Sequence, residues 1–502
     1  MAKSVMVMGT SSHVGKSIMV TALCRILRQD GWDVAPFKVQ NMSRNSAVTP
    51  DGLEMSRAQA VQAEAAGIPA NAHMNPILLK PTDGRSSQVI VQGRVHSNQP
   101  ASMYMHAEKA DLWRAATASF QYLAERYSVI VMEGAGSPVE MNLKAHDLTN
   151  MKAAEMANAA VVLVADIERG GVFASVVGTL DLLEPDERAR VVGVIINKFR
   201  GDPSLFDDGV RFLEERTGVP VLGVLPYVSD LGIDEEDSLG LTSARYNPRS
   251  AVGIRIAILP LPHLANFTDV DALFLEQDIV PFFCRTPEDL ASADAVIIPG
   301  SKNTMEDLIW LQRGWAPALQ QMRLRGCPIL GICGGYQMLG QVVRDPEGFE
   351  SPRAEVMGLG WLPIDTTLVS PKRTTWVRGH LVDAWGGHPV AGYEIHMGRS
   401  NATAEGMPLA VVRAQDDEAT HLEGSVTADG KVAGTYLHGI LDNPGFRERW
   451  LNQIRHTVGL TEHPTAVASI EAIREQAYDR LATMVRGHLR LDIVYKALGL
   501  YH

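Results

Sequence analysis

A glycine loop near the start of the chain constrains the fold more than any other stretch. Residues 4–8 form an apolar strand pattern, the loop reads Gly9-Thr-Ser-Ser-His-Val-Gly15-Lys16-Ser17, and apolar residues then recur at helical spacing. A strand, loop and helix in this order bind phosphates through backbone N–H groups, with the lysine near the terminal phosphates and the serine available to Mg²⁺. The two glycines are one residue further apart than in the common P-loop pattern. We therefore predict a nucleotide-binding α/β domain whose ATP contacts come from Gly9, Thr10, His13, Val14, Gly15, Lys16 and Ser17.

Further strand patterns end in polar segments. Apolar runs at residues 32–37, 128–132, 159–165, 191–196 and 221–225 alternate with helical or loop patterns, which predicts a parallel, doubly wound sheet. Ligands of such sheets bind at the carboxyl ends of the strands. Glu133 and Ser17 are therefore candidate Mg²⁺ ligands, and the amide of Asn197 is a candidate for reading adenine. The candidate substrate anchors are Lys38, Gln40, Asn41, Arg44, Lys80, Arg85 and Asp147, and a solvated surface charge is the alternative for each basic one.

A second α/β unit is expected after residues 229–251, a polar stretch without periodicity that is typical of a linker. Its strand pattern at residues 328–332 ends in Gly331-Ile-Cys333-Gly-Gly335, a turn that places a thiol at the start of a helical pattern. The N-terminus of a helix favours the thiolate. His438 ends a later strand pattern, and the loop at Gly300 offers an N–H group to an oxyanion. These residues predict a thiol, a base and an oxyanion site, with a buried structural cysteine as the alternative for Cys333 by itself.

Composition narrows the classes of function. The 502 residues suffice for two or three domains, and the net charge of -12 argues against a nucleic-acid surface. No stretch approaches the roughly 20 apolar residues of a membrane span. The cysteines show no paired metal spacing and are too few for a disulfide framework, so we expect a reducing compartment and a cytoplasmic location. They are Cys24, Cys284, Cys327 and Cys333.

The thiol, base and loop resemble those of class I (triad) glutamine amidotransferases. The resemblance implies that Cys333 attacks the carboxamide of glutamine and that His438 acts as the base, releasing ammonia. It also implies glutamine and oxyanion contacts from Gly300, Ser301, Gly334 and Gln337. Common members carry a Glu two residues after the His, where this chain has Ile440. The third member of the site is therefore open, with Glu394 or His396 as candidates for orienting it.

Over almost its whole length the chain resembles the cobyric acid synthase (CobQ) family. The resemblance rests on residues 9–17, 38–46, 87–93, 133–138, 147–151, 197–201, 261–271 and 393–398, and the core of the stretch at 261–271 is Asn266-Phe-Thr-Asp269. It implies two doubly wound parallel-sheet domains, a dethiobiotin synthetase-like P-loop domain and a flavodoxin-like amidotransferase domain, with a helical C-terminal tail. We place the synthetase domain at 1–228, the linker at 229–251, the amidotransferase domain at 252–445 and the helical segment at 446–502.

The family implies ATP-, Mg²⁺- and glutamine-dependent amidation of the b, d, e and g carboxylates of adenosylcobyrinic acid a,c-diamide, giving adenosylcobyric acid. The combination of an ATP site with a source of ammonia is chemically coherent, because phosphorylation by ATP turns a carboxylate oxygen into a leaving group that ammonia displaces. Two alternatives are a cobyrinic acid a,c-diamide synthase and a partition-type nucleotide-switch ATPase with an inactive C-terminal module. We expect no nucleic-acid or membrane partner, and the sequence leaves a homo-oligomer open.

Overall fold

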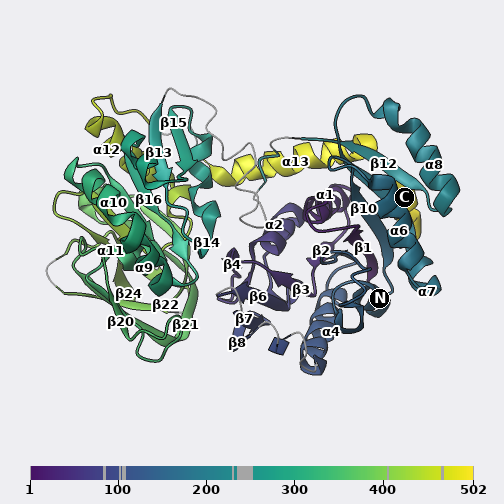
Figure 1. Ribbon diagram of the computed structural model, residues 1–502, viewed down its shortest axis with the longest axis horizontal. Coiled ribbons are helices and arrows are strands. Elements are labelled where there is room, and N and C mark those ends of the chain that lie inside the picture. Colours follow the sequence, from purple (N-terminus) through teal and green to yellow (C-terminus); the bar gives the residue numbers. More distant parts are fainter. Residues whose placement is uncertain are drawn as a thin grey trace.

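The computed structural model describes residues 2–82, 86–100, 103–104, 109–228, 231–233, 253–403, 406–415, 417–464 and 469–500. Two lobes lie side by side (Figure 1). The first lobe contains the elements up to β12 (Val221–Pro226), and the second contains those from β13 (Ile254–Ile258) to α12 (Pro444–Thr457). The chain then returns to the first lobe through the long helix α13 (Ile470–His488).

A six-stranded parallel sheet forms the centre of the first lobe, in the order β12-β11-β10-β1-β9-β2. Helices cover both faces, which is why most residues of the central strands are buried and apolar. The predicted doubly wound parallel sheet is confirmed. The other strands of this sheet are β1 (Lys3–Gly9), β2 (Val34–Phe37), β9 (Val129–Glu133), β10 (Ala160–Asp166) and β11 (Val191–Phe199). The helices are α1 (Lys16–Gln29), α2 (Arg57–Ala66), η1 (Ala72–Met74), α4 (Ala110–Ala124), η2 (Lys144–His146), α5 (Met151–Met156), α6 (Val172–Leu182), α7 (Pro185–Arg188), η3 (Pro203–Phe206) and α8 (Asp207–Thr217).

Two small sheets of the first lobe lie beside the second lobe. One has the order β3-β6-β7-β8, and the other pairs β4 with β5. Their strands are β3 (Gln40–Met42), β4 (Ser46–Val48), β5 (Glu54–Ser56), β6 (Ile77–Pro81), β7 (Ser86–Val91) and β8 (Arg94–Pro100). Strand β4 contacts β21 (Ile364–Leu381) and β22 (Pro389–Ala402) of the second lobe. The polar segment after β2 is therefore part of the contact between the lobes.

The second lobe also has a parallel sheet, in the order β15-β13-β16-β18-β26, with β25 added antiparallel at one edge. Its strands β16 (Ala295–Ile298), β18 (Ile329–Ile332) and β26 (Val432–Thr435) end near one another and lead to the loop at Gly300, to Cys333 and to His438. The other elements are β14 (Leu264–Ala265), η6 (Phe267–Leu275), β15 (Ile279–Phe283), η7 (Pro287–Ser292), β17 (Gly300–Ser301), α9 (Thr304–Gly314), α10 (Ala316–Leu324), α11 (Gly334–Leu339), β25 (Ser425–Val426) and η9 (Ile440–Asp442).

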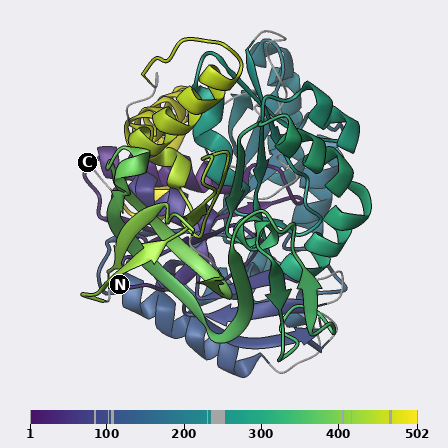
Figure 2. The ribbon, with the colours of Figure 1, turned by 90° about the vertical axis from the view of Figure 1, so that its left-hand side faces the viewer.

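A mixed, mostly antiparallel sheet forms the rest of the second lobe, and the strand patterns did not predict it. Its order is β20-β19-β21-β23-β24, and β22 pairs with β21. The long green strands β21 and β22 form a hairpin that is visible in Figure 2, where the second lobe faces the viewer. The remaining strands are β19 (Val342–Arg344), β20 (Glu355–Met357), β23 (Ala410–Ala414) and β24 (Thr420–Glu423), and η8 (Asp383–Trp385) joins β21 to β22.

The helical tail expected after residue 446 is present. Helix α12 closes the second lobe, whereas α13 and α14 (Leu491–Leu498) pack on the first lobe, where α13 contacts α1. Arg25 of α1 binds Glu475 and Asp479 of α13 at 2.7 Å each. Leu481 and Val485 of α13 enter the same buried cluster as the apolar face of α1.

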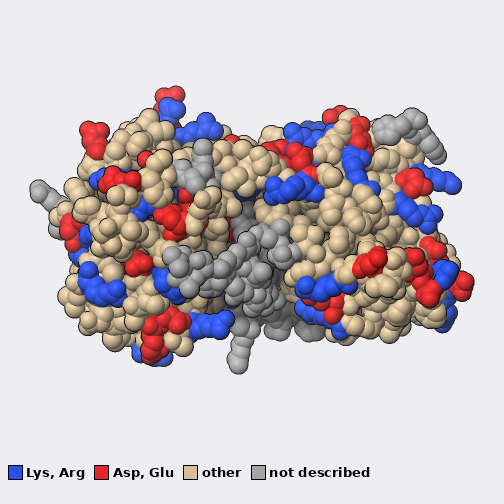
Figure 3. Space-filling view, turned by 90° about the horizontal axis from the view of Figure 1, so that it is seen from above, with Lys and Arg blue, Asp and Glu red and all other residues tan. Residues whose placement is uncertain are grey.

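Most of the predicted linker, residues 229–251, falls outside the described residues. In the part of the chain that the structure describes, no helix is long and apolar enough to cross a membrane. Lys and Arg are interspersed with Asp and Glu over both lobes on the face seen in Figure 3.

Candidate active site

The predicted phosphate loop joins β1 to α1. Gly15 has a φ of 103°, and a Cβ there would lie 2.3 Å from Nδ2 of Asn197, so only glycine fits. Lys16 turns back over the loop and donates to the carbonyl oxygens of Ser11 (3.0 Å) and Gly136 (3.1 Å). Asn197 Nδ2 donates to the carbonyl of Val14 at 2.8 Å. Asn197 therefore stabilises the conformation of the loop. A contact between Asn197 and adenine stays a prediction.

The other predicted ATP contacts lie along the same loop. The N–H of Thr10 donates to the carbonyl of Val164, and the carbonyl of His13 accepts from Lys198 Nζ at 2.7 Å. His13 has a positive φ of 61°, and Val14 is buried. A Cβ on Gly9 would lie 2.6 Å from the Val14 side chain, so the loop packs tightly against the end of β1.

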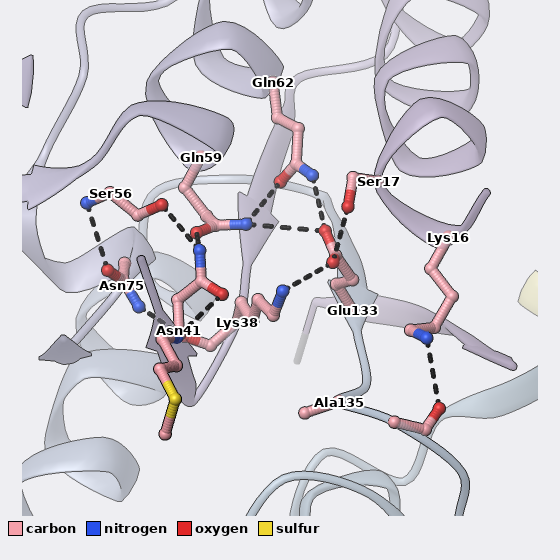
Figure 4. A network of polar contacts seen from close by, with 12 residues as sticks. Lys16, Ser17, Lys38, Asn41, Ser56, Gln59, Gln62, Asn75, Glu133 and Ala135 are labelled. Atoms are coloured by element: carbon pink, nitrogen blue, oxygen red, sulfur yellow. Dashed lines mark hydrogen bonds and ion pairs between the residues drawn. The ribbon is translucent and has the colours of Figure 1, made fainter. Parts of the chain in front are cut away.

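Glu133 is the centre of a buried polar network in the first lobe (Figure 4). Its Oε1 accepts from Ser17 Oγ (2.9 Å) and Lys38 Nζ (2.7 Å), and its Oε2 accepts from Gln62 Nε2 at 2.6 Å. The carboxylate is 1% exposed, so the lysine compensates a charge that burial would otherwise disfavour. Lys38 was predicted to anchor substrate, and here its ammonium group is bound to Glu133.

Mg²⁺ is coordinated by oxygen atoms, and in nucleotide sites a protein hydroxyl or carboxylate oxygen completes a shell of phosphate oxygens and water. Ser17 and Glu133 fit that description, because the two side chains meet at the carboxyl edge of the sheet beside the phosphate loop. Among the described residues, no group of three or more His, Cys, Asp or Glu is arranged as an all-protein metal cage. One hydroxyl and one carboxylate are a donor set that suits a cation shared with phosphates.

The remaining predicted substrate anchors are scattered around this network. Asn41 Nδ2 donates to Ser56 Oγ at 2.6 Å, and Gln40 accepts from the Tyr104 hydroxyl. Arg44 donates to the carbonyl of Pro262 at 3.0 Å and so reaches the second lobe.

Asp147 is held within its own turn, where its carboxylate accepts from Thr149 and Asn150. Arg85 lies outside the described residues. None of these contacts tests a role in substrate binding, which stays a prediction for each residue.

Cys333 lies at a strained turn between β18 and α11. Its φ is 52°, a left-handed value that is uncommon for a residue with a Cβ and is a recurrent feature of functional sites. A Cβ on Gly335 would lie 1.9 Å from the carbonyl oxygen of Ile298, so the turn requires glycine there. Sγ lies 3.6 Å from the carbonyl oxygen of Ile395. The turn presents the thiol to a pocket at the end of the parallel sheet.

His438 lies in the same pocket as Cys333, and Asp269 holds its ring. The ring Nδ1 lies 2.7 Å from Asp269 Oδ2, and Asp269 Oδ1 accepts from the N–H of Gly439 at 3.0 Å. Burial by itself lowers the pKa of His438, but Asp269 and Cys333 outweigh it and raise the pKa to about 10. The geometry is that of a thiol and an imidazole with a carboxylate behind the ring.

Asp269 is the residue that sequence reasoning missed as the third member. It occupies a short helix, η6, and was visible only as the last residue of Asn-Phe-Thr-Asp. The open alternatives were Glu394 and His396, but neither is the ring partner of His438. Glu394 instead lies beside Arg373, His396 and His421.

The pocket is open to solvent and has about 510 Å³ of empty space, part of which is continuous with that solvent. Gly300, Ser301 and Gln337 line it together with Cys333 and His438. A Cβ on Gly334 would lie 2.9 Å from the backbone nitrogen of Ser301, so the turn and the loop abut. The structure therefore brings together the six residues that are predicted to surround a carboxamide, five of them lining the pocket and Gly334 lying against Ser301.

Gln337 is fixed on both sides of its amide. Its Oε1 accepts from Thr304 Oγ1 at 2.9 Å, and its Nε2 donates to the Tyr436 hydroxyl at 3.2 Å.

The first lobe also contributes to this pocket. Lys80 of β6 is one of the lining residues. Its Nζ lies 2.8 Å from Glu54 Oε1, and Lys372 of β21 lies 2.6 Å from Glu54 Oε2. Burial raises the pKa of Glu54, but Lys372 and Lys80 outweigh it and hold the pKa well below its usual range. A buried lysine–glutamate–lysine cluster thus joins the two lobes at the pocket wall.

Ser46 of the first lobe is hydrogen-bonded to two residues that contact the imidazole of His438. The N–H of Ser46 donates to Asn266 Oδ1 at 2.9 Å, and Asn266 Nδ2 lies 3.4 Å from His438 Nδ1. The carbonyl of Ser46 accepts from the Tyr393 hydroxyl at 3.3 Å, and the Tyr393 ring stacks on His438 with centroids 5.2 Å apart. The segment after β2 thus reaches the imidazole through two side chains.

Comparison with known proteins agrees with this division into two units. Residues 5–239 match the model of the CobQ/CobB/MinD/ParA nucleotide binding domain, and residues 255–446 match that of the CobB/CobQ-like glutamine amidotransferase domain. The chain is 47% identical to the cobyric acid synthase of Geobacillus kaustophilus (98% of this chain, 97% of that protein). It is 49% identical to that of Pelotomaculum thermopropionicum (100% and 97%) and 48% identical to that of Nostoc punctiforme (97% and 99%).

Proposed function

The chain belongs to the cobyric acid synthase family, and from this premise we propose how its two sites divide the reaction. As a member it is a glutamine-dependent ligase of cobalamin biosynthesis with a nucleotide-binding domain. We propose that it amidates the b, d, e and g carboxylates of adenosylcobyrinic acid a,c-diamide, using ATP and ammonia taken from glutamine. Cobyrinic acid a,c-diamide synthase would use the same chemistry on fewer carboxylates.

In the second lobe, the Cys333 thiolate attacks the carboxamide carbon of glutamine. The N–H groups around Gly334 and Ser301 stabilise the oxyanion, and protonated His438 gives its proton to the amide nitrogen, which leaves as ammonia when the C–N bond breaks. A glutamyl thioester remains, and a water molecule that loses a proton to His438 cleaves it to glutamate and free thiol. Asp269 keeps Nδ1 of the ring protonated and directs the other nitrogen to the reaction.

In the first lobe, a substrate carboxylate oxygen attacks the terminal phosphate of ATP, and ADP leaves. Ammonia then attacks the acyl phosphate, which yields the amide and inorganic phosphate. Lys16 stabilises the charge that develops on the phosphates. Mg²⁺, when bound by Ser17 and Glu133, would neutralise phosphate charge. Lys38, released from Glu133, would be free to bind the carboxylate or its phosphate.

The observation that carries the proposal is the pair of Cys333 and His438 at the ends of β18 and β26, with Asp269 of η6 behind the imidazole. A binding module without chemistry would not need a strained cysteine facing an imidazole whose pKa is raised to about 10. This is the argument against the partition-type ATPase with an inactive second lobe. A cytoplasmic location is part of the proposal, and the four free cysteines are in keeping with it.

Two variants test the division of labour. Cys333→Ser should lose glutamine-dependent amidation and keep the ATP-dependent reaction with ammonium. Lys16→Ala should lose amidation with either nitrogen source. The assay is the mass of the corrinoid product after incubation of the a,c-diamide with ATP and each nitrogen source. Full glutamine use by the cysteine variant, or full activity of the lysine variant, would refute the corresponding assignment.

A further inference from the structure

One lysine in the Cys333 pocket, Lys302, makes no side-chain hydrogen bond or ion pair with any residue that the structure describes. Lys302 lies between β17 and α9 and lines the pocket. Its backbone N–H donates to the carbonyl of His263. Among the described residues, no carboxylate lies within 4.0 Å of its ammonium group and no hydrogen bond to that group is found. Lys80 and Lys372, the other two lysines of the pocket wall, both bind Glu54.

The surroundings of Lys302 favour an incoming anion. Burial, and after it the nearby Lys80, lower the pKa of Lys302, and the more distant charges of Glu350 and Glu54 offset this only in part. An unpaired ammonium group in a buried pocket is costly, and a carboxylate that binds there would relieve the cost.

One carboxylate in the same pocket has a free oxygen. Oε2 of Glu350 accepts from the N–H groups of Thr304 (2.6 Å) and Met305 (3.3 Å) at the N-terminus of α9. No partner of Oε1 is found in the described part of the chain. Burial raises the pKa of Glu350 to about 7, although the charge of Lys302 and the N–H groups of Met305 and Thr304 act to lower it. An ammonium group beside Oε1 would favour the ionised form.

We propose that Lys302 and Glu350 are the site for the α-carboxylate and α-ammonium groups of the amino-acid substrate, with Lys302 binding the carboxylate. This inference rests on the proposed glutaminase function. It concerns the α-carbon end of glutamine, which the residues around the carboxamide do not contact. Lys302 and Glu350 are not ion-paired with each other, and both face the pocket that contains Cys333. A zwitterion supplies one opposite charge to each, so the pair selects an α-amino acid over a simple amide.

Two analogues of glutamine, each lacking one charged group, test the assignment. Glutaramate lacks the α-amino group, and γ-aminobutyramide lacks the α-carboxylate, while both keep the carboxamide. The measurement is kcat/KM for ammonia release from glutamine and from each analogue by the full-length chain. The variants are Lys302→Met and Glu350→Gln. Lys372→Met is the matched control, because Lys372 lines the same pocket and is already ion-paired with Glu54.

The parent should prefer glutamine over each analogue by roughly 10- to 100-fold, the range of a charge-assisted hydrogen bond. Lys302→Met should lose about that factor on glutamine and glutaramate and little on γ-aminobutyramide. Glu350→Gln should lose it on glutamine and γ-aminobutyramide and little on glutaramate. Lys372→Met should change the three substrates by the same factor. Amidation with ammonium, kept by all variants, shows that they fold.

Equal losses on all three substrates in Lys302→Met would mean a structural role and would overturn the assignment. A loss confined to carboxylate-bearing substrates in Lys372→Met, and absent in Lys302→Met, would overturn it in favour of Lys372. Failure of the proposed function would look different, because the parent itself would then release no ammonia from glutamine.

Discussion

Replacing Asp269 by Asn should disable glutamine use while leaving ammonium use intact. The pKa of His438 rises from 6.5 to about 10, which corresponds to roughly 5 kcal/mol of preference for the imidazolium form. Asp269 is the first of the groups that raise this pKa, so losing its carboxylate should remove a large part of the preference, roughly 2–3 kcal/mol. A loss of that size in transition-state stabilisation is about two orders of magnitude in kcat/KM for glutamine.

The sign of the pH effect follows from the same contact. Because the pKa of His438 is raised, the imidazole that must protonate the departing amide nitrogen stays charged up to about pH 10 in the parent. Without the carboxylate the pKa falls, so the alkaline limb of the rate profile for glutamine should move to lower pH.

The assay is glutamate release across pH, with ammonium-dependent amidation as the measure of folding. Glu394→Gln is the matched control, because Glu394 is a buried carboxylate of the same lobe that contacts Arg373 and not His438. Unchanged glutamine turnover by Asp269→Asn, or an equal loss in Glu394→Gln, would refute the reasoning.

Three further predictions concern contacts that join the two lobes or pack the terminal helices on the first lobe. Glu54→Gln leaves two buried lysines uncompensated and should lower the free energy of unfolding by about 3–5 kcal/mol in urea titrations. Pairing with the two lysines lowers the pKa of Glu54, so the Glu54 carboxylate stabilises the folded state at pH values above its ordinary pKa of 4.5. This stabilisation is lost as the pH falls from 4.5 towards the lowered pKa. The free energies of unfolding of the parent and the variant should therefore converge in acid. Leu481→Ala should cost about 2–5 kcal/mol, seen as a lower Tm, because the residue is 1% exposed in the cluster under α1. Tyr393→Phe removes the hydrogen bond to Ser46 but keeps the ring on the imidazole, so glutamate release should persist while the ratio of glutamate to amide product rises.

The parts of the site that local patterns describe were predictable. The glycine turn of Cys333 and the strand end of His438 each have a signature within a few residues, and parallel strands bring such ends to one edge. Asp269 has no such signature, because a short 3-10 helix far away in sequence delivers it, and only tertiary packing decides which carboxylate meets the imidazole. The absent Glu at Ile440 indicated that a partner was missing but not where it came from.

The same limit applies to the fold. Burial along β21 alternates, but charged residues near its middle hide that pattern, so the hairpin with β22 was not predicted. Strand β11 runs on to Phe199, three residues beyond the apolar run, because pairing with β12 continues past it. The ion pair between Lys38 and Glu133 depends on side-chain geometry that spacing does not contain.

The return of α13 and α14 to the first lobe changes how the chain can be divided. Tyr478 binds Glu64 at 2.9 Å, Arg486 binds Asp30 at 2.6 Å, and the N–H of Arg490 donates to the carbonyl of Leu222. The first lobe is therefore a discontinuous domain, and the second is an insertion between its body and its last two helices. A single cut between the lobes would leave the P-loop domain without the helices that cover α1. Separating the two activities takes two cuts, with the terminal helices rejoined to the domain whose core they complete.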